Sequence, residues 1–151
     1  MSASRSGGRR ESRSTRVLYV SRIGGDELFD LREAIETFVV QRIAGKLGPN
    51  QISQLRENIR RQADAAHKAR VADATRLDTE FHTMVCGFLG NREMSQTLSR
   101  MREKLHILIL GNLTRRPQRL ETSYREHAAI AAALIKGRAD HAADLVRKHL
   151  D

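Results

Sequence analysis

The stretch LDTEFHTMVCGFLGN, residues 77–91, decides the fold that the sequence predicts. Its apolar residues recur every three or four positions, which is typical of one face of a helix, and Gly90-Asn91 is a plausible helix end. Asp78 and His82 are four residues apart, so on a helix they are neighbours at the edge of the apolar face. Ionisable side chains rarely lie on a core face unless they are paired or bound to a cation. The stretch therefore predicts a packed helix with two polar groups that point inward.

The same apolar periodicity predicts five more helices. Their approximate ranges are 26–44, 50–70, 92–113, 119–136 and 140–151, and the first predicted helix covers about 72–89. Asp26 and Asp140 are candidate N-caps, and glycine or proline follows several of the predicted ends. Helix-forming residues dominate, the chain has only two prolines, and the predicted links are short. The expected fold is all-α, an antiparallel bundle of six or seven helices.

The chain of 151 residues divides into two parts by composition, a tail at 1–25 and one domain at 26–151. The tail holds six arginines and one glutamate, and so +5 of the formal net charge of +9. It is rich in serine and glycine without periodicity, so we expect a disordered segment that holds DNA weakly, if it is more than a solubilising or misassigned leader. No apolar run approaches the ~20 residues of a membrane span, and we expect a cytoplasmic protein without a membrane partner. The single cysteine, Cys86, fits a small core residue and is assigned no role.

Two further histidines join the first pair. His127 lies at the centre of an apolar stripe, and His149 is flanked by apolar residues on the last helix. A single histidine on such a face is more often a hydrogen-bonded core residue, but three histidines with one aspartate indicate a metal site. Imidazole nitrogens with one carboxylate oxygen suit Zn²⁺, Ni²⁺, Co²⁺ or Mn²⁺, with positions left open for water or a small carboxylate. The other histidines, His67, His106 and His141, are predicted to be structural or exposed.

The pattern resembles the FCD domain, the effector-binding C-terminal domain of GntR-type regulators of the FadR subfamily. The resemblance covers residues 26–151 and rests on LFDLREAIE at 28–36, LDTEFHTMV at 77–85, GN at 90–91, REHAAIAAALIKGRADHAADL at 125–145 and HL at 149–150. It implies a helical bundle in which one aspartate and three histidines, here Asp78, His82, His127 and His149, hold a divalent metal, most often Zn, Ni or Mn. It also implies that an arginine of the first helix, here Arg32, holds a small organic acid. The alternative for Arg32 is an exposed residue that pairs with Glu36.

The resemblance implies the ligand-sensing domain of a transcriptional regulator, which acts as a homodimer and is not an enzyme. Full regulators carry a winged helix-turn-helix before the FCD domain, and residues 1–25 are too few to contain one. We therefore expect DNA binding only through a domain that this chain lacks, or weakly through the tail. Two other functions remain open, a metal-dependent enzyme acting on a small carboxylate and a helical interaction module.

Overall fold

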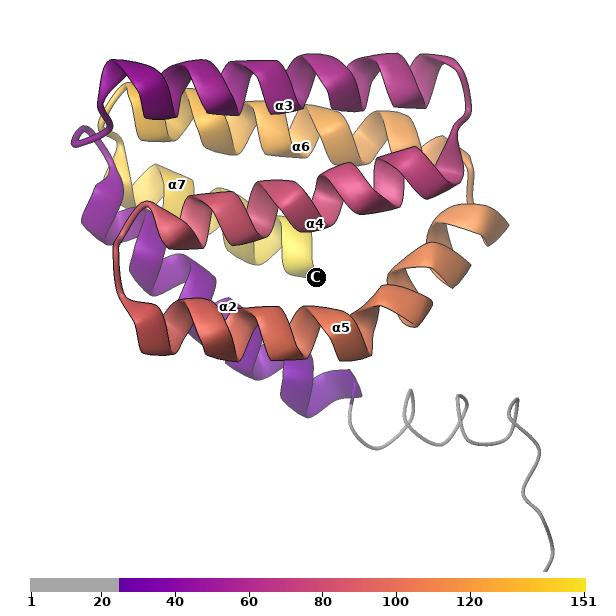
Figure 1. The fold of residues 1–151 in the computed structure, drawn as a ribbon, viewed down its shortest axis with the longest axis horizontal. Helices are drawn as coiled ribbons and strands as arrows, with labels where there is room; N and C mark the ends of the chain where they lie inside the picture. The colour runs from indigo at the N-terminus through magenta and orange to yellow at the C-terminus, as the bar shows by residue number, and fades with distance from the viewer. Residues whose placement is uncertain (1–24) are drawn as a thin grey trace, which may run out of the picture.

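The computed structural model describes residues 25–151, which form an all-α fold of six helices with no strand in that range (Figure 1). The helices are α2 (Gly25–Ile43), α3 (Pro49–His67), α4 (Val71–Gly87), α5 (Arg92–Arg115), α6 (Gln118–Ile135) and α7 (Ala139–Leu150). The predicted fold class and all six predicted helices are confirmed. Apart from Gly25, the predicted basic tail lies outside the described residues.

The side chains that cap the helices differ from the predicted ones. Asn91 does not end α4 but caps α5, where its side-chain oxygen accepts a hydrogen bond from the Met94 amide at 3.0 Å. Gly90 does supply the left-handed backbone, with φ of +77°, that separates the two helices. Asp26 and Asp140 are not caps, because each lies inside the first turn of its helix. A carboxylate in the first turn still stabilises the helix, since it lies at the positive end of the helix dipole.

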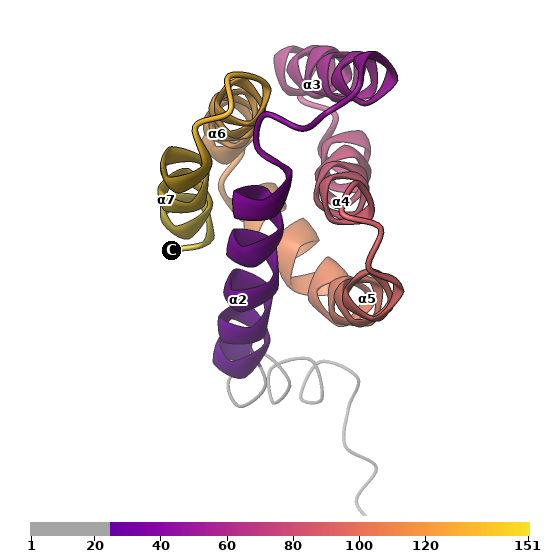
Figure 2. The ribbon, with the colours of Figure 1, turned by 90° about the vertical axis from the view of Figure 1, so that its left-hand side faces the viewer.

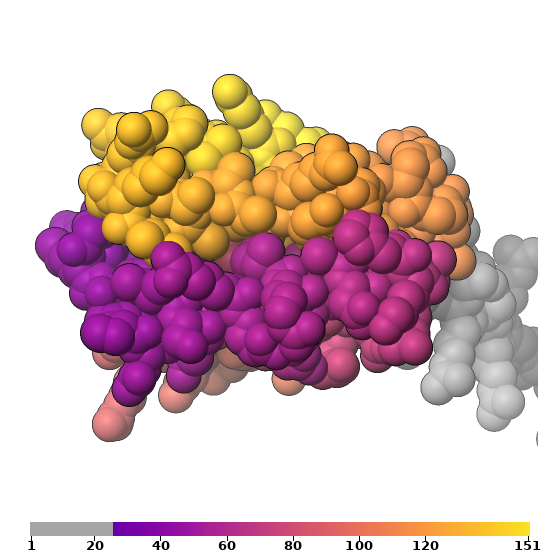
Figure 3. All heavy atoms as spheres, turned by 90° about the horizontal axis from the view of Figure 1, so that it is seen from above, coloured from indigo at the N-terminus to yellow at the C-terminus, as the bar shows by residue number. Residues whose placement is uncertain are grey.

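The six helices form a closed ring. Around it the order is α2, α7, α6, α3, α4 and α5, and α5 returns to α2. Figures 1 and 2 show this arrangement from two directions, with α3 and α6 side by side on one edge. The space-filling view from above shows the same two helices packed together along their length (Figure 3). Side chains that point inward from any helix therefore meet in one interior.

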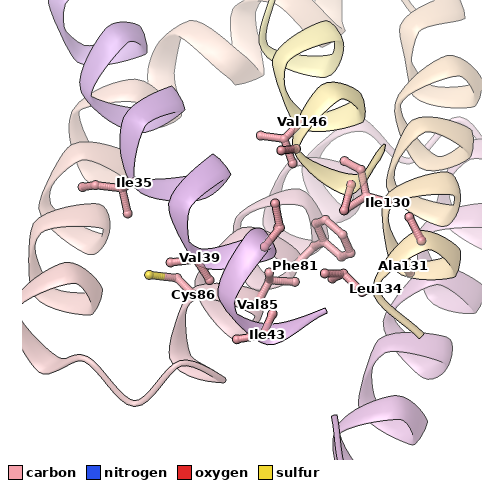
Figure 4. Close-up of a cluster of buried hydrophobic side chains, with 14 of the residues drawn as sticks. Ile35, Val39, Ile43, Phe81, Val85, Cys86, Ile130, Ala131, Leu134 and Val146 are labelled. Atoms are coloured by element: carbon pink, nitrogen blue, oxygen red, sulfur yellow. The ribbon is translucent and has the colours of Figure 1, made fainter. Parts of the chain in front are cut away.

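The core inside the ring is mainly aliphatic. Val39 of α2, Phe81 of α4 and Leu134 of α6 are at most 1% exposed and are drawn with their neighbours in Figure 4. Cys86 is a buried free thiol in the same cluster, as predicted. Its burial raises its pKa, which makes the thiol less reactive. Among the described helices, none is both long and apolar enough to cross a bilayer.

Candidate metal centre

The structure brings the four predicted metal ligands together inside the ring. Asp78 and His82 come from α4, His127 from α6 and His149 from α7, and each offers one atom within 4.8 Å of the other three. The Nε2 atoms of the three histidines form a triangle with sides of 2.9, 3.1 and 3.2 Å. Asp78 Oδ1 lies 3.4 Å from His82 Nε2 and 3.3 Å from His127 Nε2. Asp78, His82 and His127 are buried and His149 is partly buried, so the cluster lies below the surface.

The opposite nitrogen of each imidazole has its own acceptor. His82 Nδ1 contacts Glu36 Oε1 of α2, and His149 Nδ1 contacts Glu126 Oε2 of α6. His127 Nδ1 lies 2.6 Å from Gln62 Oε1 of α3. A neutral imidazole has one N–H, and in each ring the acceptor places it on Nδ1. Each Nε2 therefore points its lone pair into the triangle.

Gln62 is itself held in the orientation that His127 needs. Its amide Nε2 donates to Asn58 Oδ1 at 2.6 Å, and Asn58 Nδ2 donates to the Leu77 carbonyl at 3.3 Å. This chain leaves the Gln62 oxygen, not its NH₂ group, facing the imidazole. Gln62 and Asn58 are almost fully buried, so water cannot replace these partners at low cost. The hydrogen-bond chain therefore fixes the His127 tautomer.

Three lone pairs at such short separations repel one another unless a cation lies between them. An ion bound by nitrogen at about 2.1 Å separates adjacent nitrogens by about 3.0 Å in octahedral geometry and about 3.4 Å in tetrahedral geometry. The observed sides of 2.9 to 3.2 Å, and the 3.3 and 3.4 Å from Asp78 Oδ1 to two of these nitrogens, lie in the range that one ion can bridge. Hydrogen bonds from the second ring nitrogen to carboxylates or amides are also characteristic of metal-bound histidine. The donor set thus fits a divalent metal ion.

Burial and neighbouring charges keep these groups in the protonation states that a metal requires. Burial, together with the adjacent His149, lowers the pKa of His127 to about 3. Burial also lowers the pKa of His82, although the Glu36 carboxylate opposes the shift. Burial alone would raise the pKa of Asp78, but the Arg102 guanidinium holds it well below its usual range. Near neutral pH, His82 and His127 are therefore neutral and Asp78 is ionised.

Arg102 of α5 forms an ion pair with Asp78. Its Nη2 contacts Asp78 Oδ2 and lies 3.2 Å from Thr79 Oγ1, so the other aspartate oxygen, Oδ1, remains directed at the histidines. The Arg102 side chain is 1% exposed, and among the described residues no group accepts a hydrogen bond from its Nε or Nη1. A buried arginine is costly unless it is paired, which makes Asp78 its necessary partner.

A cavity of about 130 Å³ opens beside the cluster. Asp78 and His149 form its inner wall, Arg32 of α2 and Arg119 of α6 also line it, and its apolar lining includes Phe29. Arg32 does pair with Glu36, at 2.6 Å from Nε to Oε2, but it is only 3% exposed. The alternative of an exposed surface arginine is therefore wrong. Arg32 lies on the wall of a cavity that reaches the histidine cluster.

Several residues of this centre were not predicted. Glu36, Gln62, Arg102 and Glu126 each contact one of the four predicted ligands, and Arg119 lines the cavity. Arg102 had a signal, since it lies between Met101 and Leu105 on an apolar stripe where a cation requires a partner. The three histidines predicted to be structural or surface residues, His67, His106 and His141, are all exposed.

Comparison with known proteins agrees with the architecture. A family model of the FCD domain matches residues 27–151, most of the chain. A search of curated proteins gives no match. FCD domains are the C-terminal effector-binding domains of GntR-family regulators. The chain belongs to the FCD domain family and contains a ligand-sensing regulatory domain of the GntR type.

Proposed function

We propose that this FCD domain senses a small organic acid through a divalent metal ion held by Asp78, His82, His127 and His149. One observation carries the proposal: the Nε2 atoms of three imidazoles face one another at 2.9 to 3.2 Å. Nitrogen ligands with one carboxylate suit zinc, nickel or manganese. Four protein ligands on an ion that accepts five or six would leave positions for water or a small carboxylate.

The acid would be held between the ion and Arg32. When bound, the ion acts as a Lewis acid that attracts a carboxylate oxygen. Arg32 uses Nε for Glu36, which leaves its two amino groups for another carboxylate oxygen. Its guanidinium lies 5.7 Å from the centre of the Phe29 ring, which restricts its orientation. Arg32 would thereby fix the position of the acid.

The position of Arg32 suggests how binding reaches the rest of a regulator. Arg32 lies on α2, which packs chiefly against α7, the helix that carries His149. An acid that bridges the ion and Arg32 would fix α2 relative to α4, α6 and α7. In GntR-type regulators the DNA-binding domain precedes the FCD domain, so among the described helices α2 follows it first in sequence. We expect the regulator to act as a homodimer, as is typical of this family.

The cavity gives little support to the alternative of an enzyme. Among the described residues that line it, Asp78 is the only carboxylate, and Arg102 and the proposed ion both engage it. Glu36 and Glu126 accept hydrogen bonds from histidines and do not line the cavity. A hydrolytic site would need a free acid or base beside the metal-bound water. The arrangement suits binding better than catalysis.

The acid site can be tested with Arg32→Ala in metal-loaded protein. Thermal shifts with a panel of short hydroxy and sugar acids should identify acids that stabilise the wild type. Arg32→Ala should weaken their binding by about 1.5 to 3 kcal/mol, the scale of a charged hydrogen bond, without loss of the metal. Arg42→Ala is the matched control, because Arg42 is an exposed arginine of the same helix that stacks on Phe38. Equal binding of an acid by metal-free protein, or by Arg32→Ala, would contradict the proposal.

A further inference from the structure

The charges around the histidine cluster occur as three matched pairs. The pairs are Arg32 with Glu36, Arg102 with Asp78, and Arg119 with Glu126. Each of the three carboxylates also contacts at least one histidine of the cluster. With neutral imidazoles, which metal binding requires, these residues have no net charge before an ion binds. The protein therefore offers no surplus negative charge to a metal.

A divalent ion would add two positive charges to this balanced and largely buried set. Charge without compensation is costly in a low-dielectric interior. Arg102 already neutralises Asp78, so the negative charge that compensates the ion has to come from the bound acid. We propose that the effector is a dianionic acid, a short dicarboxylate, and that Arg119 holds its second carboxylate. This inference rests on the proposed metal and acid site and names the class of acid.

Arg119 is placed for this second contact. It lines the cavity together with Ser123, one turn further along α6, and Asn112 of α5. Its contact with Glu126 is long, 3.6 Å, and its side chain is 44% exposed, so its guanidinium lies at the mouth of the cavity. Ser123 is one helical turn, about 5 to 6 Å, from His127 along the α6 axis. Arg119 lies a further turn away, and Glu126, which contacts both Arg119 and His149, links it to the proposed metal ligands.

The rest of the cavity fits the carbon chain of such an acid. Its volume of about 130 Å³ is well below that of pockets for drug-sized ligands, which span roughly 300 to 1,000 Å³. Apolar side chains line it as well, namely Phe29, Ile109, Leu113 and Leu150. They can contact methylene groups between two carboxylates. A cavity with cations at two places and apolar lining favours a dicarboxylate over a monocarboxylate of equal size.

Calorimetry on metal-loaded protein tests this with malonate, succinate and glutarate, each paired with its monoamide. The monoamide has nearly the same shape and one charge less. At about pH 7.5, where both carboxyl groups are ionised, the best diacid should bind about tenfold more tightly than its monoamide. Arg119→Gln should lose most of this preference while it keeps one metal ion and its affinity for the monoamide. Arg116→Gln, which removes an exposed arginine near the start of the same helix, should behave like wild type.

A second measurement on the wild type needs no variant. By linkage the diacid raises the affinity for the metal by the same factor as the metal raises the affinity for the diacid, and charge balance predicts that this factor is large. The monoamide should raise the affinity for the metal much less. Equal affinity for diacid and monoamide, or an unchanged preference in Arg119→Gln that still holds metal, would overturn the dianion proposal alone. Protein that binds no metal, or neither acid, would overturn the metal and acid site as well.

Discussion

The position of one hydrogen on each imidazole decides whether the histidine cluster can hold a cation. Glu36, Gln62 and Glu126 place that hydrogen on Nδ1, which leaves the three Nε2 lone pairs free. Gln62 differs from the two glutamates because an amide can also present a donor. Its orientation depends on Asn58, which accepts from the Gln62 amide at 2.6 Å. Gln62 is thus the residue through which tautomer control can be tested.

Gln62→Met should weaken metal binding about 10- to 100-fold, the usual effect of losing a partner of a metal-bound histidine. Methionine has a similar size but accepts hydrogen bonds weakly, so His127 would lose the acceptor that fixes its tautomer. Gln54→Met is the control, since Gln54 is exposed on the same helix. Titration of both variants with nickel would measure the effect. Wild-type affinity in Gln62→Met would show that the tautomer does not need this support.

The lowered pKa of His127 predicts how the metal-free protein responds to acid. The pKa falls from an unfolded value of 6.5 to about 3, so between these values the unfolded chain binds the proton and the folded chain does not. Stability should therefore be full above about pH 6.5 and should decrease toward pH 3, by up to about 1.4 kcal/mol per pH unit from this group. Urea unfolding across this range would measure it. Stability that rose as the pH fell would contradict the burial of a neutral His127.

Residue spacing was sufficient to find the ligands but not their partners. Asp78 and His82 are one turn apart on a helix, so their shared face follows from the sequence alone. Glu36 and Gln62 reach the histidines from other helices, across 46 and 65 residues of sequence. Only the packing of the ring sets those contacts. The two interpretations of Arg32, in the acid site or exposed, stayed open for the same reason, because pairing with Glu36 is compatible with either an exposed or a buried position.

At the scale of elements, two turns hold the ring closed at one end. Gly45 follows α2 and Gly137 follows α6, and both have left-handed backbone, with φ of +75° and +73°. Their backbones touch, so that a Cβ atom on Gly45 would lie 3.1 Å from the Gly137 Cα. The Gly45 amide also donates to the Leu134 carbonyl at 2.9 Å. These contacts dock α2 and α6 at the end where both helices terminate.

Gly137→Ala should lower the free energy of unfolding by about 1 to 3 kcal/mol, because alanine is strained in left-handed backbone and crowds Gly45 here. Gly48→Ala is the control, since a Cβ atom there meets nothing within 4 Å and the backbone φ is −76°. Urea unfolding of both variants would compare them. Equal stability of Gly137→Ala and wild type would mean that the contact between the turns is not needed.

The helices themselves were predictable because glycine, proline and asparagine mark most of their ends. The order of the helices around the ring could not be predicted from the sequence. Short links favour packing between successive helices, yet α2 packs chiefly against α7, the last helix of the chain. That pairing depends on the combined shape of all apolar faces. It also determines that Arg32 and His149 line the same cavity.

At the scale of the whole molecule, every described helix supplies a polar group to one interior site. The groups are Glu36 of α2, Gln62 of α3, Asp78 and His82 of α4, Arg102 of α5, His127 of α6, and His149 of α7. An ion at the centre would therefore join α4, α6 and α7 directly and the other three helices through hydrogen bonds. Metal and acid binding would act on the whole bundle, as a sensor domain requires.

Titration of chelator-treated protein with zinc, nickel and manganese tests this account most directly. We predict one high-affinity ion per protomer for at least one of these metals. His127→Ala and His149→Ala should each lose most of this affinity. His149 is only partly buried and lies near the end of α7, so its substitution disturbs the core less than that of His127. His141→Ala, an exposed histidine of the same helix, should bind like wild type. Wild-type protein that takes up none of the three metals, or His127→Ala and His149→Ala variants that bind as the wild type does, would contradict the proposed metal centre.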